Sequence, residues 1–213
     1  MRTETFDIPG PAGRLESILM LPDWPPVAAA VLCHPHPLHG GTMHFKAVYH
    51  AARAFQENGC AALRFNFRGV GRSAGRHDHG RGEQDDLRAA LDEIERRFAG
   101  LPILLGGFSF GSVMALKVGV RDPRAKALLA LGFPLSTVPN TAFLADCTLP
   151  RLFIQGEFDQ FGSEMDLQAL VDRLPEPRSL EVIPGSDHFF TGHLDRLHRT
   201  IASWVRSQPW TQG

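Results

Sequence analysis

The sequence has few cysteines, no long hydrophobic run and no excess of either charge. Its three cysteines, Cys33, Cys60 and Cys147, do not form the pattern of a disulfide framework, and none lies in a Cys-x-x-Cys pair. We therefore expect reduced, mostly buried thiols in a cytoplasmic protein. No apolar run approaches the roughly 20 residues that a membrane-spanning helix needs. Residues 1–7 contain no apolar segment typical of a signal peptide.

The charges are nearly balanced, with 22 Lys and Arg against 23 Asp and Glu and a net charge of -1. Without a basic stretch, neither a nucleic acid nor a membrane surface is an expected partner. The hydrophobic share of 43% is ordinary for a globular protein. We find no repeat, low-complexity tract or linker, so 213 residues predict one domain spanning 1–213.

Apolar runs alternate with helical patterns along most of the chain. Two initial strands are expected at 3–8 and 14–21, joined by a turn over 9–13. We expect later strands at 27–33, 61–67, 101–105, 127–131, 151–155 and 180–183, and helices at 47–57, 83–98, 110–120, 164–174 and 194–206. Because continuous apolar strands that alternate with helices are typical of buried parallel sheets, this pattern predicts an α/β fold. Its mostly parallel sheet should have about seven or eight strands, with helices on both faces.

A Gly-x-Ser-x-Gly motif lies between a predicted strand and a predicted helix. Its serine is Ser109, and the strand–turn–helix context is the one that a nucleophile elbow requires. Asp159 and His188 each follow a later predicted strand, and the order Ser, acid, His is typical of α/β hydrolases. Since the carboxyl ends of parallel strands meet at one edge of a sheet, we expect these three residues to lie together there.

These residue types suit nucleophilic catalysis. A serine hydroxyl is a weak nucleophile until a neighbouring base, such as His188, takes its proton. A carboxylate behind the imidazole, here Asp159, would fix the tautomer and stabilise the imidazolium. Three nearby residues remain alternatives: Glu157 for the acid, and His193 and His198 for the base. Asp159 could also simply cap the helix that follows it.

An oxyanion hole would need two N–H donors. The residue after the nucleophile, Phe110, should supply the first. The second should come from the loop 33–41, whose prolines have no N–H to give. His36 and Leu38 are the nearest donors, and we favour His36.

Five segments of the chain resemble the α/β-hydrolase superfamily, and the resemblance covers essentially the whole length. They are residues 33–43, 64–73, 107–111, 156–159 and 186–190. The chain is most similar to small, lidless serine hydrolases of the dienelactone-hydrolase-like type. This resemblance implies a Ser109–His188–Asp159 triad and gives loop 33–41 the part of the superfamily's His-Gly oxyanion loop. The chain departs from the pattern with His34-Pro35 in place of His-Gly, and from dienelactone hydrolases proper with Ser instead of Cys at the elbow.

No cofactor or metal is expected. Histidines occur at 34, 36, 39, 44, 77 and 79. They lack helical metal-binding spacing, and the prolines splay their loop, so we interpret them as lining the mouth of the active site. The glycines of 69–75 do not match Gly-x-Gly-x-x-Gly, which argues against a dinucleotide. We interpret Arg64, Arg68 and Arg72 as structural ion-pair formers.

The interval 133–150, where lids usually enter this superfamily, is too short for a helical cap of several turns. An open, shallow site follows, with Leu38, Phe161 and Phe189 as possible substrate-pocket residues. Phe110 and Phe161 are further candidates for the walls of an acyl pocket.

The resulting hypothesis is a carboxylesterase-like serine hydrolase that cleaves small carboxylic esters through an acyl-enzyme on Ser109. A thioesterase, a peptidase or a lactone hydrolase would use the same residues, and a non-catalytic binding protein could share the fold. The small-molecule ester, its chain length and the oligomeric state are left open by the sequence.

Overall fold

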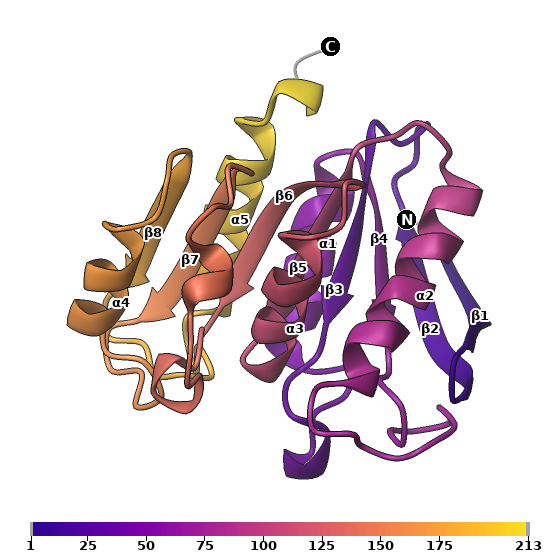
Figure 1. Cartoon of the computed structure of the whole chain (residues 1–213). Helices are drawn as coiled ribbons and strands as arrows, with labels where there is room; N and C mark the ends of the chain where they lie inside the picture. Colours follow the sequence, from indigo (N-terminus) through magenta and orange to yellow (C-terminus); the bar gives the residue numbers. More distant parts are fainter. Residues whose placement is uncertain (1, 212–213) are drawn as a thin grey trace.

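The computed structural model describes residues 2–211, whose eight strands form one sheet in the order β1-β2-β4-β3-β5-β6-β7-β8 (Figure 1). The strands are β1 (Arg2–Gly10), β2 (Gly13–Leu21), β3 (Ala28–Cys33), β4 (Cys60–Phe65), β5 (Ile103–Phe108), β6 (Ala125–Leu131), β7 (Arg151–Gly156) and β8 (Arg178–Ile183). β2 pairs antiparallel with β1 and with β4, and every other neighbouring pair is parallel. The predicted mostly parallel sheet is confirmed.

Helices cover both faces of this sheet, as predicted. The helices are α1 (Lys46–Glu57), α2 (Gly82–Arg97), α3 (Phe110–Gly119), α4 (Glu164–Val171) and α5 (Leu194–Arg206). α1 and α5 share one apolar core with the sheet, and α2, α3 and α4 share a second core on the opposite face. Every residue of β3, β4, β5 and β7 is buried. Burial on both faces explains why these strands are continuous apolar runs rather than alternating patterns.

The first hairpin differs from its sequence-based prediction. A turn over 9–13 was expected, but β1 continues to Gly10 and β2 begins at Gly13, which leaves a two-residue turn. Pro9 pairs with Arg14 inside the ladder. Proline is tolerated there because β1 is an edge strand and its outer N–H groups need no partner.

The segment between β6 and β7 contains only two short 3₁₀ helices, at Leu135–Thr137 and Ala142–Leu144. Within residues 2–211 no lid domain covers the sheet edge, as predicted. Two other 3₁₀ helices lie at Pro37–His39, which we call η1, and at Pro209–Thr211. Over the same residues, no helix combines the length and the apolar character required to cross a membrane.

The carboxyl ends of the parallel strands lie along the lower edge of the sheet in Figure 1. Ser109 follows β5 directly, Asp159 lies three residues beyond the end of β7, and His188 lies five residues beyond the end of β8. The parallel topology therefore places these three segments at one edge.

Candidate active site

The turn from β5 into α3 holds Ser109 in a strained backbone conformation. Its φ is 54° and its ψ is -121°, a region that residues with a side chain rarely occupy. A Cβ at Gly107 would lie 2.4 Å from the Gly111 carbonyl carbon, and a Cβ at Gly111 would lie 2.4 Å from the Cys33 carbonyl oxygen. Glycine is therefore required at both positions for α3 to pack this closely against β3 and β5.

The structure brings the three predicted residues into one hydrogen-bonded chain. Ser109 Oγ lies 3.0 Å from His188 Nε2, and His188 Nδ1 lies 2.7 Å from Asp159 Oδ2. The side chains of His188 and Asp159 are almost completely buried. With the proton on Nδ1, the imidazole donates to the carboxylate and leaves Nε2 free to accept the serine proton.

The Asp159 carboxylate is fixed by two further hydrogen bonds. Gln155 Nε2 donates to Oδ2 at 2.8 Å, and the Phe161 N–H donates to Oδ1 at 2.8 Å. Asp159 does not cap the following helix, since Ser163 is the N-cap of α4. Gln155 was missed by the sequence analysis. Its only sequence signal is a polar residue directly after the apolar run of β7.

The alternative acid and bases have other partners. Glu157 Oε2 accepts a hydrogen bond from the Gly185 N–H at 2.7 Å. His198 Nε2 pairs with Glu57 Oε2 at 2.9 Å. His193 is the residue that precedes α5, and its N–H donates to a backbone carbonyl. None of the three residues contacts Ser109 or Asp159 through a hydrogen bond among the described residues.

Both residues favoured as oxyanion-hole donors have an unpaired backbone N–H among the described residues. Among residues 2–211, the N–H groups of Phe110 and His36 have no hydrogen-bond acceptor, and the two rings lie 5.1 Å apart. The Leu38 N–H, the other candidate, donates to His36 Nδ1 at 3.2 Å. Phe110 is also the first residue of α3, where the helix dipole favours negative charge.

His34 anchors the loop that follows β3. Its buried ring donates from Nδ1 to the Pro35 carbonyl at 2.6 Å and accepts at Nε2 from the Phe67 N–H at 3.0 Å. Burial lowers the pKa of His34 to about 4, so the ring is neutral at pH 7. Sequence reasoning did not identify this role, because the contact joins residues that are 33 positions apart.

The arginines of segment 64–73 are only partly as predicted. Two of them form ion pairs, Arg68 with Asp86 and Arg72 with Glu16. Arg64 does not, which corrects the prediction. Its guanidinium donates to the Met43 carbonyl at 2.6 Å and lies over the Tyr49 ring at 5.3 Å. This hydrogen bond ties β4 to the segment before α1, while the buried Arg64 Nε has no partner among the described residues.

Of the six histidines expected to line the mouth, His36, His39, His77 and His79 form one cluster of neighbouring rings. His34 is instead fully buried, which corrects that prediction for this residue. The rings of His36 and His39 stack at 4.4 Å, and His77 lies 4.9 Å from His36. Burial, followed by the neighbouring imidazoles of His39 and His77, lowers the pKa of His36. Within the described part of the chain, no three His, Cys, Asp or Glu side chains are arranged to hold a metal ion.

The three cysteines are free and buried, in agreement with the sequence-based expectation. Burial raises the pKa of the Cys33 and Cys60 thiols, that of Cys60 to about 12. Because the thiolate is the reactive form, these two thiols are poor nucleophiles at neutral pH.

Aromatic side chains surround the His188 imidazole. The rings of Phe161 and Phe189 lie 4.6 Å and 5.2 Å from it, both edge to face. Leu38, the third predicted pocket residue, lies on η1 with 67% of its surface exposed. Phe110 packs against His36 and Phe67 and is only half-buried.

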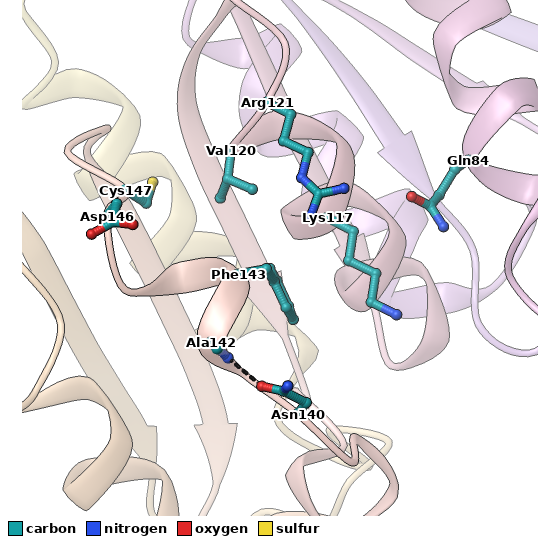
Figure 2. Close-up of a pocket in the computed structure, with 9 residues that line it drawn as sticks. All are labelled: Gln84, Lys117, Val120, Arg121, Asn140, Ala142, Phe143, Asp146 and Cys147. Carbon is teal, nitrogen blue, oxygen red and sulfur yellow. Dashed lines mark hydrogen bonds between the residues drawn. The ribbon is translucent and has the colours of Figure 1, made fainter.

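A separate cavity of about 710 Å³ lies between α3 and segment 140–147 (Figure 2). Lys117 projects from α3 and Arg121 from the turn that follows it, and Phe143 forms the opposite wall. None of the described residues that line this cavity is a serine or a histidine. It therefore lacks the serine–histidine pair that lies at the strand edge.

Comparisons with known proteins agree with this geometry. A model of the alpha/beta hydrolase domain matches residues 28–203. An uncharacterized protein of Rickettsia prowazekii is 36% identical over 204 residues, which cover 92% of this chain and 86% of the relative.

Two solved structures are similar over nearly their whole length. An alpha-beta serine hydrolase homologue from Coxiella burnetii is 37% identical, with a TM-score of 0.89 over 95% of this chain and 97% of that one. XC6422 from Xanthomonas campestris, described as a serine hydrolase without a lid, is 33% identical, with a TM-score of 0.88 over 97% and 94%. Motif, topology and relatives together show that the chain belongs to the α/β-hydrolase domain family.

Proposed function

We propose that the protein is a serine esterase that cleaves small carboxylic esters through an acyl-enzyme on Ser109. The hydrogen-bonded chain from Ser109 Oγ through His188 to Asp159 is the observation that carries this proposal. The strained elbow adds support, because backbone strain of this kind persists mainly at functional sites.

In the proposed reaction, Ser109 Oγ attacks the ester carbonyl carbon while His188 Nε2 takes the hydroxyl proton. The N–H groups of Phe110 and His36 stabilise the negative charge that develops on the carbonyl oxygen. The imidazolium then returns its proton to the leaving alcohol, and the acyl group remains on Ser109. A water molecule, activated by the same imidazole, releases the acid and restores the serine. These steps use only side chains, backbone and water.

Small substrates are proposed because the segment between β6 and β7 forms no lid over the strand edge. Within the described chain, no lid is therefore present over this edge to enclose a long acyl chain. We further propose that the chain works as one catalytic domain in the cytoplasm. The single sheet supports the first point, and three free thiols support the second.

Hydrolysis of p-nitrophenyl esters by purified variants tests the assignment. With p-nitrophenyl acetate, we expect Ser109→Ala and His188→Ala to lower kcat by about 10⁶-fold, and Asp159→Asn to lower it by about 10⁴-fold. The matched controls Glu157→Gln and His193→Asn should change kcat less than about twofold. With the wild-type protein, kcat/KM should fall as the acyl chain lengthens from acetate to palmitate.

Full activity in Ser109→Ala would contradict the proposed nucleophile. An equal loss in Glu157→Gln and Asp159→Asn would contradict the choice of Asp159. A clear preference for the long-chain esters would argue against the small-substrate part of the proposal.

A further inference from the structure

A cavity of about 530 Å³ lies immediately beside the proposed base, between the start of α1 and the segment that follows His188. Its walls include Phe45, Phe189 and Leu194, and its polar residues include Thr42 and Thr191. Cavities of this size that combine apolar walls with a few polar groups are typical of small-molecule sites.

Aromatic rings connect this cavity directly to the catalytic centre. The Phe189 ring lies 5.2 Å from the His188 ring and 6.3 Å from the Phe45 ring. Phe45 in turn stacks at 5.0 Å on Phe108, the buried residue that precedes Ser109. A group bound against Phe45 and Phe189 would therefore belong to a substrate whose ester carbonyl lies at Ser109.

The exposure of Phe189 is built into the backbone. Phe190 adopts a φ of 56°, which is unusual for a bulky residue, and its own ring is fully buried. Asp187 Oδ1 accepts hydrogen bonds from the N–H groups of Phe189 at 3.1 Å and Thr191 at 2.9 Å. This turn buries one phenylalanine and holds the other outward, 47% exposed.

The electrostatics of Asp187 agree with this interpretation. Burial alone would raise the pKa of its carboxyl, but hydrogen bonds from Thr191 and Phe189 outweigh burial and lower it. The carboxylate therefore stays ionised and keeps the turn in place at neutral pH.

We propose that the substrate ester carries an aromatic ring, which packs against Phe45 and Phe189 in this cavity. The two rings are only 6.3 Å apart and tilted by 49°, whereas a third ring inserted between them would need about 7 Å. The substrate ring therefore lies across both, in the offset or edge-to-face geometry that aromatic pairs prefer. This inference names the substrate class of the proposed esterase and rests on that function.

Matched ester pairs, whose members differ in whether the ring is aromatic or saturated, test the inference. Benzyl acetate is compared with cyclohexylmethyl acetate, which places the ring in the alcohol. Methyl phenylacetate is compared with methyl cyclohexylacetate, which places it in the acid. For the wild-type protein we expect kcat/KM to favour the aromatic member of at least one pair by about 3- to 10-fold.

Phe189→Leu and Phe45→Leu keep an apolar side chain but remove the ring, so each should lower the aromatic preference by about 2- to 10-fold. Phe158→Leu is the matched control. Phe158 is also exposed, at 66%, but does not line the cavity, and its substitution should leave the preference unchanged.

Ethyl acetate separates failure of this inference from failure of the proposed function. If ethyl acetate is hydrolysed but the wild type shows no aromatic preference, the inference is wrong and the esterase function stands. The same holds if the preference persists in both Phe→Leu variants. If ethyl acetate and all four test esters resist hydrolysis, the proposed function is wrong, and the inference that rests on it is wrong as well.

Discussion

Two imidazoles near the carboxyl edge of the sheet have different hydrogen-bond partners. His188 lies between a hydroxyl and a carboxylate, so both ring nitrogens face groups that can exchange or hold a proton. His34 instead faces a carbonyl and a backbone N–H, and this pair of partners is satisfied only by a neutral ring. The loop that presents the His36 N–H therefore depends on His34 staying uncharged.

This requirement predicts a dependence of stability on pH. In the folded protein the pKa of His34 is about 4, whereas an unfolded histidine has a pKa of about 6.5. Between these values the unfolded chain binds a proton that the folded chain does not, so stability falls as the pH is lowered through this window. Above pH 6.5 the His34 ring is neutral in both states and no longer makes the stability depend on pH.

Urea unfolding of the wild type and His34→Asn at pH 7.5 and pH 5 measures this effect. The variant should be less stable at pH 7.5, because the loop loses its anchor. At pH 5 the difference in free energy of unfolding between the wild type and the variant should be smaller by about 2 kcal/mol, since the variant lacks the titrating group. A gap that stays constant with pH would show that His34 is not the buried neutral ring described above.

At the scale of elements, the β5–α3 turn holds a residue with a side chain in a strained backbone conformation. Ser109 occupies a conformation that costs about 1–3 kcal/mol for a residue with a Cβ and almost nothing for glycine. Ser109→Gly should therefore be more stable than Ser109→Ala by about 1 kcal/mol, with a Tm about 2–4 °C higher. Neither variant should hydrolyse esters. Equal melting temperatures would contradict the strain that we assign to the elbow.

The sequence was most informative about strands and helices. The apolar runs of β3 to β7 and the periodic patterns of the helices predicted their bounds to within a few residues, because these elements are buried on defined faces. The first hairpin was predicted, but its turn was expected to be too long because Pro9 and Gly10 suggest a turn in isolation. Their place in an edge strand, where proline is tolerated, depends on the neighbouring strand.

Contacts between elements could not be predicted in the same way. Gln155 reaches Phe133 and His34 reaches Phe67 only after β7 and β3 are placed next to other segments, and Arg64 finds a carbonyl where a carboxylate was expected. The sequence contains no periodic pattern or motif that would predict these contacts. The sequence therefore predicted the site residues at the strand ends but not the groups that hydrogen-bond to them.

At the scale of the whole molecule, the parallel sheet brings distant segments of the chain to one edge. Ser109 and His188 are separated by 79 positions, and His188 and Asp159 by 29, yet the topology brings all three into hydrogen-bonding distance. The motif and the order of residues predicted which side chains would meet. That they act together as a catalytic unit remains a proposal.

Labelling with a fluorophosphonate probe, followed by mass spectrometry of the intact protein and its peptides, tests that proposal most directly. The probe reacts with a serine only when a neighbouring base activates it. We expect one probe per chain, attached to Ser109, with no labelling of Ser109→Ala and much slower labelling of His188→Ala. A wild-type protein that takes up no probe, or that takes it up at another residue, would contradict the account.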